Sequence, residues 1–166
     1  MKISYNWLKQ YLNLDLEVTK VGEILTDIGL EVEGIDKFSS IKGGLKGIII
    51  GEVIEKYKHP NADKLNLTKV DVGQGEALQI VCGAPNVDVG QKVPVATVGT
   101  ILYNENSEIK IKKGKIRGEY SYGMICSEKE LGLGSDDSGI MVLSKNVING
   151  TLGSEDLIIK KIIKNF

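Results

Sequence analysis

Short apolar segments separated by glycine-containing turns follow one another from residue 47 to residue 126, and they constrain the fold more than any other feature of the sequence. The segments are rich in β-branched residues, and several alternate apolar with polar side chains, as half-buried strands do. Such a series is typical of a small barrel, so we predict a mainly β fold with five or six strands. The predicted strands are GIIIGEVIEKYK (47–58), LNLTKVDV (65–72), ALQIVC (77–82), KVPVAT (92–97), EIKIKK (108–113) and YGMIC (122–126).

Two details of this series predict local irregularities. The first strand is expected to end at His59-Pro60, because proline lacks the N–H group that a strand interior needs. In the second strand the apolar positions change phase at Thr68-Lys69. One extra residue in a strand has this effect, so we predict a β-bulge there.

Two short segments in the C-terminal part of the chain have sequence features of a helix. In SEKELGL, Ser127 has the character of an N-cap and Glu130 follows three residues later, which together form a capping box. This pair predicts a single helical turn inside the β region. The final segment SEDLIIKKIIKNF (154–166) is consistent with a helix or with an edge strand.

The N-terminal region has a different pattern. A helix is predicted over residues 17–28, where apolar residues recur at helical spacing and Gly29 suits the position just past a helix end. Either Thr19 or Asp15 is expected to cap it. The segment SSIKGGLKG (39–47) is small, polar and rich in glycine, which predicts a linker between this region and the barrel.

Composition excludes several classes of protein. Hydrophobic residues make up 42% of the chain, yet no apolar run approaches the roughly 20 residues that span a bilayer. The N-terminal MKISYNWLKQYL lacks the apolar core of a signal peptide, so we predict a cytoplasmic protein without membrane contact. The net charge of −1 argues against a protein that coats nucleic acid through its overall charge.

Candidate catalytic and metal-binding residues are few. The single histidine, His59, lies beside turn residues and has only Asp63 as a nearby carboxylate, which favours a structural turn over a general base. Cys82 and Cys126 are far apart in apolar surroundings and are predicted to be small core residues rather than zinc ligands. The chain has no phosphate-binding loop and no Gly-x-Ser-x-Gly. We therefore predict no catalytic residue, metal site or cofactor site.

A basic stretch, IKIKKGKIR (109–117), is the best candidate for binding. In an extended chain Ile109 and Ile111 would face the core, and the first lysines would face outward, with further basic residues past a turn at Gly114. Such a cluster can follow a phosphate backbone, although lysines also protect strand edges from aggregation. Base stacking is expected to be limited, since the nearby aromatic residues are only Tyr103, Tyr120 and Tyr122.

The motifs HPNADKL, VDVG, IVCGAPNV, GQKVPVATVGT and KIRGEYSYGMICSEKELGL resemble a known family in order and spacing. The family is the tRNA-binding domain of the oligonucleotide-binding fold, which is found in the β subunit of bacterial phenylalanyl-tRNA synthetase. This resemblance covers about residues 44–143. The N-terminal ISYNWLKQYLNLDLEVTKVGEILTDIGLEVEGID is similar to the start of that subunit, which stand-alone tRNA-binding proteins lack.

The resemblance implies a division of the chain. A five-stranded oligonucleotide-binding-fold barrel would occupy residues 48–143 and would be inserted in a small α+β unit. That unit would consist of residues 1–38 and of a return segment, residues 144–166, which would pack against them, with residues 39–47 as the linker.

The resemblance also implies partners. The parent enzyme would be an α2β2 ligase that joins phenylalanine to its tRNA with ATP and magnesium, whereas this fragment would hold no cofactor and no active site. Its partners would be tRNA, other domains of the β subunit and the α subunit. Two alternatives remain open, which are an assembly module with little RNA contact and a stand-alone tRNA-binding protein.

Residue roles are carried over from the matching motifs and from local charge. Neutral or apolar residues of the third motif, such as Ile116 and Met124, are expected in the barrel core. The residues expected to shape the motifs are His59, Pro60, Asn61, Asp63, Gly83, Asn86, Ser121, Gly123 and Met124. The residues expected to contact RNA are Lys110, Lys112, Lys113, Lys115 and Arg117.

Overall fold

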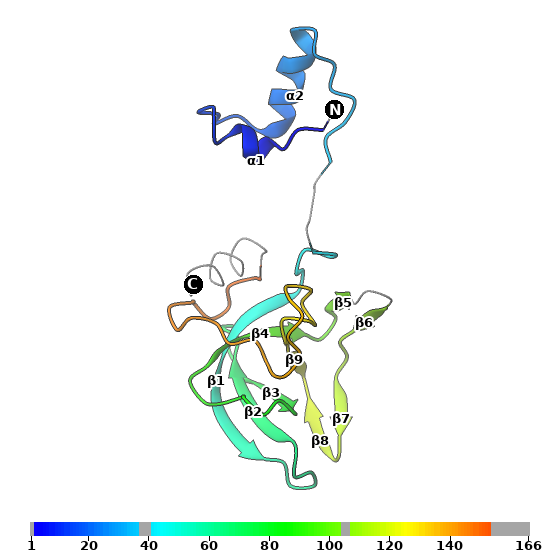
Figure 1. The fold of residues 1–166 in the computed structure, drawn as a ribbon. Helices are drawn as coiled ribbons and strands as arrows, with labels where there is room; N and C mark the ends of the chain where they lie inside the picture. Colours follow the sequence, from blue (N-terminus) through cyan, green and yellow to red (C-terminus); the bar gives the residue numbers. More distant parts are fainter. Residues whose placement is uncertain (1, 37–40, 104–106, 154–166) are drawn as a thin grey trace. The chain divides into compact units, whose positions relative to one another are not determined.

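A computed structural model describes residues 2–36, 41–103 and 107–153 of the chain. Its contacts divide the chain into two compact units, residues 1–38 and residues 39–166, each of which is described by itself (Figure 1). The described residues include no helix that is long and apolar enough to cross a membrane.

Two short helices, α1 (Tyr5–Leu8) and α2 (Val18–Asp27), make up the described part of the first unit. The predicted helix is confirmed, but the predicted caps are wrong, because Glu17 occupies the N-cap position without a side-chain hydrogen bond. Gly29 follows the helix with φ of 93°, the left-handed conformation that glycine adopts without strain. Residues 2–36 contain no strand, so the β part of the predicted α+β unit is not found among them.

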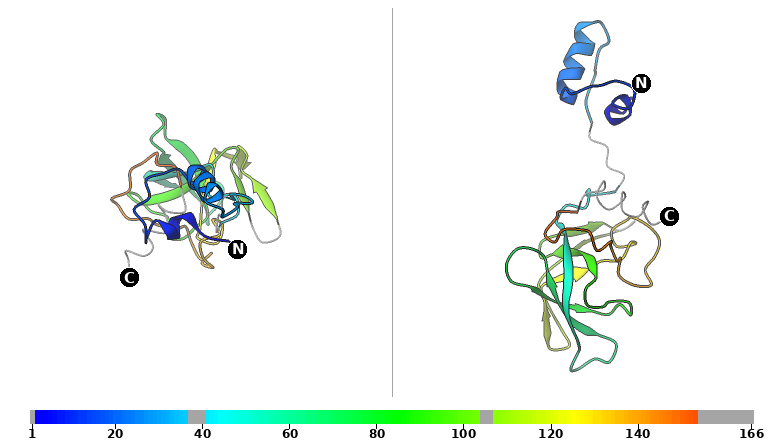
Figure 2. Two further views of the ribbon diagram at one scale, coloured as in Figure 1. Left: turned by 90° about the horizontal axis from the view of Figure 1, so that it is seen from above. Right: turned by 90° about the vertical axis from the view of Figure 1, so that its left-hand side faces the viewer.

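Five antiparallel strands form the main sheet of the second unit, in the order β3-β2-β1-β4-β9. The sheet closes almost completely, because two hydrogen bonds join β3 to residues 121–122, just before β9. Tyr122 N–H donates to the Gln79 carbonyl at 2.9 Å, and Val81 N–H donates to Ser121 Oγ at 3.1 Å. The right-hand view of Figure 2 shows the curvature of the strands. The predicted five-stranded barrel is thus confirmed. The strands are β1 (Ile48–Lys58), β2 (Asn66–Asp71), β3 (Leu78–Cys82), β4 (Lys92–Thr97) and β9 (Gly123–Ile125).

Two hairpins lie between β4 and β9 in the sequence. The first pairs β5 (Ile101–Tyr103) with β6 (Glu108–Lys110), and the second pairs β7 (Gly114–Ile116) with β8 (Glu119–Ser121). Only β6 was predicted from the sequence. All four strands are three residues long, but the alternation of β6 continues to Ile111 and could be seen in the sequence, whereas β5, β7 and β8 are too short to show one.

Two apolar clusters cover opposite faces of β1. Ile49 and Val53 belong to the cluster inside the barrel, whereas Ile48 and Ile50 belong to a second cluster on the other face. Burial on both faces explains why this strand begins with an uninterrupted apolar run instead of an alternating one. The second cluster also receives Ile41 from the predicted linker, so the described residues of that segment pack against the barrel.

The β-bulge predicted in the second strand is wrong, because the bulge lies on the neighbouring strand, β1. Val53 pairs with Val70 and Glu55 pairs with Lys69, which leaves Ile54 of β1 as the extra residue. The phase change in β2 has another cause, because Thr68 is a core residue and donates its hydroxyl hydrogen to the Ile80 carbonyl at 2.9 Å. A polar residue at a buried position therefore produced the same sequence pattern as a shift of register.

The segment that follows the barrel runs along β1. Ile50 N–H donates to the Thr151 carbonyl at 2.9 Å, and Gly153 N–H donates to the Ile48 carbonyl at 2.7 Å. Residues 154–166 of the predicted return segment lie outside the described residues. The packing of 144–166 against the first unit stays a prediction.

Candidate nucleic-acid interface

The β7–β8 hairpin carries the end of the basic stretch. Ile116 pairs with Glu119, which leaves Arg117 and Gly118 as a two-residue loop. Both loop residues have positive φ, 50° and 107°, as in the turn that matches the twist of a hairpin. The turn is therefore at Arg117-Gly118 and not at Gly114, which instead begins β7.

The hairpin tip is held by the loop that follows β1. His59 Nε2 lies 3.0 Å from the Ile116 carbonyl oxygen, and Asn61 Nδ2 donates to the Arg117 carbonyl at 3.2 Å. Asn61 N–H donates to His59 Nδ1 at 3.1 Å, so Nδ1 is the acceptor and Nε2 carries the hydrogen that the Ile116 carbonyl accepts. We call His59, Asn61 and their two carbonyl partners the hairpin latch.

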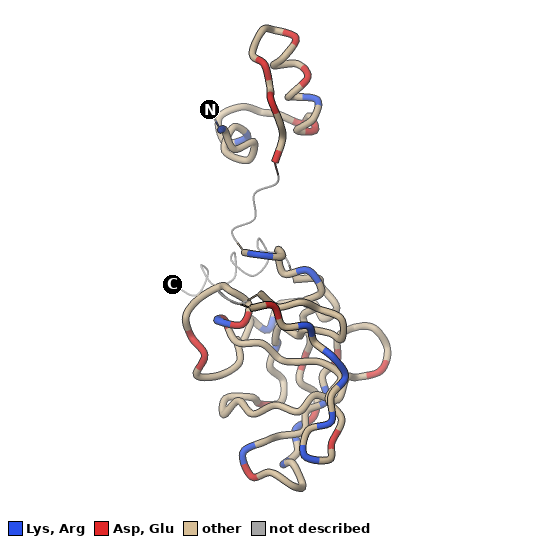
Figure 3. Tube along the Cα trace, turned by 90° about the vertical axis from the view of Figure 1, so that its right-hand side faces the viewer, with Lys and Arg blue, Asp and Glu red and all other residues tan. Residues whose placement is uncertain are grey.

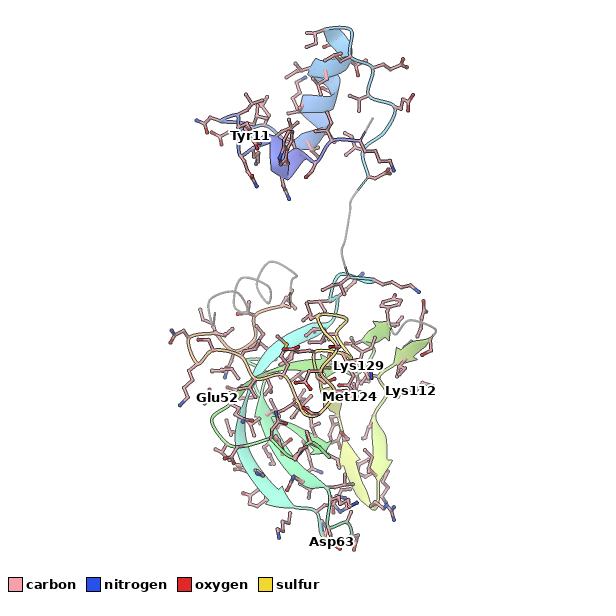
Figure 4. All side chains as sticks on the ribbon, viewed as in Figure 1. Tyr11, Glu52, Asp63, Lys112, Met124 and Lys129 are labelled. Atoms are coloured by element: carbon pink, nitrogen blue, oxygen red, sulfur yellow. The ribbon has the colours of Figure 1, made fainter. Side chains whose placement is uncertain are left out.

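The other residues of this first motif shape the loop itself. His59 is buried, while Pro60 and Asp63 are exposed on the turn. His59 N–H donates to the Leu65 carbonyl at 3.0 Å and closes the loop. Figure 4 shows Asp63 at the end of the barrel where the β7–β8 hairpin also ends.

All five basic residues predicted to contact RNA are exposed. Figure 3 faces this side of the molecule and shows blue segments along the chain that leads into the β7–β8 hairpin. Within the described residues, none of the five forms an ion pair with a carboxylate of the chain. We call this set the basic edge: Lys110, Lys112, Lys113, Lys115 and Arg117.

The apolar residues of the same stretch do not all face the core. Ile111 is buried, as predicted, but Ile109 is 46% exposed and Ile116 is 39% exposed. The predictions for Ile109 and Ile116 are wrong because their strands belong to two-stranded sheets, in which no second layer covers the outer face. Met124, which was expected in the barrel core, is half-buried and packs instead against the second cluster, on the other face of β1.

Two tyrosines join the basic edge. Lys115 pairs directly with Tyr120 across the hairpin, and its Nζ lies 5.4 Å from the centroid of that ring. Lys113 Nζ lies 4.9 Å from the Tyr120 centroid and 4.7 Å from the Tyr122 centroid. An ammonium group at these distances is attracted by the ring face. Tyr103 lies elsewhere, under Lys42 at 5.0 Å.

Ser121 and Gly123 fix the strand that carries these tyrosines. Ser121 is buried, and its hydroxyl accepts from Val81 N–H and donates to the Gly123 carbonyl at 2.9 Å. A Cβ on Gly123 would lie 2.9 Å from the Ala96 carbonyl oxygen, so the close approach of β9 to β4 requires glycine. These contacts place both residues in the seam of the barrel.

Asn86 and Gly83 lie on the loop after β3, away from the basic edge. The Asn86 amide donates to the Ile140 carbonyl at 2.8 Å and accepts from Ile140 N–H at 2.9 Å, which fastens residues 139–141 to the barrel. A Cβ on Gly83 would meet Leu65 at 3.2 Å. Both residues thus shape loops and offer no charge to a ligand.

The two cysteines are free and buried, as predicted. Burial raises the pKa of the Cys82 thiol and raises that of Cys126 to about 12, so neither forms the thiolate that nucleophilic or metal chemistry needs. The described residues contain no group of three or more histidine, cysteine, aspartate or glutamate side chains that could hold a metal ion.

Residues 48–152 match the family model described as "Putative tRNA binding domain". The chain is 54% identical over 155 residues to the phenylalanine–tRNA ligase β subunit of Bacteroides fragilis, with 93% of this chain and 19% of that protein covered. The same subunit of Geobacter sulfurreducens is 46% identical over 163 residues, with 95% and 20% covered. The chain therefore spans about a fifth of the length of these relatives.

A solved structure also matches. The C-terminal domain of Plasmodium vivax p43 is 27% identical, with a TM-score of 0.45 over 62% of this chain and 56% of that chain.

Proposed function

Because the chain belongs to the tRNA-binding domain family and is homologous to the N-terminal part of bacterial phenylalanine–tRNA ligase β subunits, we propose that its barrel contacts the phosphate backbone of tRNA through the basic edge. The parent protein would be a phenylalanine–tRNA ligase. In it, this domain would help to hold tRNA(Phe) during aminoacylation, while ATP and magnesium would act at an active site elsewhere in an α2β2 enzyme of the cytoplasm.

The observation that carries this proposal is the set of exposed cations without carboxylate partners among the described residues. A cation that is already paired gives up an ion pair when it binds phosphate, whereas these cations give up only water, counterions and, for Lys113 and Lys115, a contact with a tyrosine ring. The hairpin latch also supports the proposal, because it fixes the position of the loop that contains Arg117. Phosphate contacts need positive charge at defined positions more than they need a pocket.

The experiment is a salt titration. Fluorescence anisotropy would measure the affinity of the 166-residue chain for unfractionated bacterial tRNA at a series of salt concentrations. If three to five phosphates are neutralised, the logarithm of the association constant falls against the logarithm of the salt concentration with a slope of about −2 to −4.

A charge-reversed variant locates the site. Lys112→Glu with Arg117→Glu should weaken binding and make the slope shallower by about one to two units. Lys46→Glu with Lys145→Glu makes the same change of net charge at exposed lysines outside the basic edge and serves as the control. An unchanged affinity for the first variant, in a folded protein, would rule out the basic edge as the contact surface.

A second candidate function is docking onto the rest of the β subunit. Large apolar side chains of the first unit are exposed, among them Trp7 at 51%, Tyr11 at 69% and Ile28 at 68%. The homologous subunits are about five times as long as this chain and offer ample surface to cover them. The same titration separates the two functions, since absence of tRNA binding even at low salt would favour docking over RNA contact.

A further inference from the structure

We propose that Tyr120 and Tyr122 form a stacking platform for unpaired RNA bases, with Lys113 and Lys115 placed to hold the adjoining phosphates. We call these four side chains the tyrosine platform. The proposal rests on the proposed function and adds the class of RNA that the surface takes, namely nucleotides outside a duplex.

Both rings lie on the same side of the chain. Tyr120 belongs to β8 and Tyr122 lies at the bend between β8 and β9, with the buried Ser121 between them, and Lys113 Nζ lies near the centroids of both rings. Tyr120 is 45% exposed and Tyr122 is 37% exposed. Their centroids are 6.3 Å apart and their planes are inclined by 38°.

The two lysines add groups that bind phosphate to the two rings on which bases stack. Surfaces that bind single-stranded nucleic acid combine aromatic faces, on which bases stack, with cations that follow the backbone. Lys113 lies over both rings and Lys115 over one of them. Their ammonium groups are exposed on flexible stems, so they can move from the ring to an incoming phosphate and uncover the face that a base would occupy.

The backbone beneath the rings is already fixed by β3. Gln79 Nε2 donates to the Tyr120 carbonyl at 2.9 Å, and the Gln79 carbonyl accepts from Tyr122 N–H at 2.9 Å. One residue therefore holds the main chain at both tyrosines. A platform fixed before binding loses little conformational freedom when the ligand arrives.

The geometry selects unpaired bases over paired ones. In a duplex the faces of the bases are stacked on one another and only their edges are accessible in the grooves. A ring that offers its face needs a base whose face is free, as in a loop or a single strand. The platform should therefore distinguish RNAs of equal charge by their unpaired nucleotides.

The test compares two RNAs and three variants by fluorescence anisotropy with the 166-residue chain. One RNA is a hairpin with an unpaired loop, and the other is a fully paired duplex with the same number of phosphates. The double variant Tyr120→Leu, Tyr122→Leu removes both rings, while Tyr120→Phe, Tyr122→Phe keeps them. Tyr57→Leu removes an exposed tyrosine of β1 and is the matched control.

We expect wild-type protein to prefer the hairpin, and the leucine pair to weaken hairpin binding at least about fivefold, as loss of one stacked base would. The salt slope should stay unchanged, because no cation is lost. The phenylalanine pair and Tyr57→Leu should bind as wild type does. Should the leucine pair unfold, a fluorescent adenine analogue in the loop gives a second measurement, since stacking on wild-type protein quenches its emission.

Two results would overturn the platform. One is equal binding of hairpin and duplex by wild type, and the other is wild-type affinity of the folded leucine pair for the hairpin. If tRNA still binds with the expected salt slope, only the platform fails. If wild type binds no RNA at any salt concentration, the proposed function fails and the platform fails with it.

Discussion

Truncation of His59 to alanine should destabilise the barrel through the hairpin latch. The side chain makes two hydrogen bonds, to the Ile116 carbonyl and from Asn61 N–H, and it is 5% exposed. Each hydrogen bond contributes about 1 kcal/mol net, and removal of a buried ring adds a cavity. We expect a loss of about 2–4 kcal/mol in the free energy of unfolding, which corresponds to a fall in Tm of roughly 5–15 °C.

Two further substitutions divide the effect between the bonds. His59→Gln can keep a donor near the position of Nε2, and His59→Asn can keep an acceptor near the position of Nδ1. Each should therefore lose less stability than His59→Ala. Urea denaturation gives the free energies, and amide hydrogen exchange reports whether the β7–β8 hairpin opens more often than the rest of the barrel.

The loss of the His59 hydrogen bonds should also affect one part of the barrel more than the rest. Exchange should accelerate most at the hairpin amides, such as those of residues 114–121, because their tip has lost its anchor. A loss below about 0.5 kcal/mol for His59→Ala would refute the reasoning, since surface substitutions give as much. A larger loss that left hairpin exchange unchanged would refute it too.

Two more predictions concern the barrel walls. The pKa of the Asp71 carboxyl lies below its ordinary value, chiefly because Gly73 N–H donates to it. The contribution of Asp71 to stability is therefore complete above about pH 4 and is lost as the pH falls through the lowered pKa. Asp71→Asn should therefore flatten the acid decline in stability measured by urea denaturation over a pH series. Gly123→Ala brings a Cβ within 2.9 Å of the Ala96 carbonyl oxygen and should cost about 1–3 kcal/mol, whereas Gly34→Ala meets nothing within 4 Å and should be nearly neutral. Equal thermal melting of these two glycine variants would contradict the close-packed seam.

Regular elements were predictable because their signals are repeated along the sequence. The apolar run of β1 and the helical spacing over residues 17–28 each involve several residues, so one ambiguous position does not hide them. Thr68 shows the limit of this reasoning. Threonine has nearly the shape of valine and can be buried in the core when its hydroxyl group donates to a carbonyl. Here that carbonyl belongs to Ile80 on another strand, so the burial of Thr68 depends on the strand pairing.

The candidate site was only partly predictable. The basic residues could be found from charge alone, but the arrangement of the tyrosines could not, since base stacking was expected to be limited. The alternation Tyr120-Ser121-Tyr122 was the available signal, because a small polar residue between two aromatic ones predicts rings on one side of a strand. The role of Gln79 depends on closure of the barrel, which brings it to Tyr120, 41 positions further along the chain.

The hydrogen bond from Gly153 N–H to the Ile48 carbonyl, at 2.7 Å, brings together the point where the chain enters the barrel and the point where it leaves. The segment between these two residues, which contains the barrel, therefore begins and ends at nearly the same place. A surface loop with such adjacent ends can be exchanged for a whole domain at little cost in closure entropy. The two ends of the barrel therefore lie close together, which is the geometry that insertion of a domain into another protein requires.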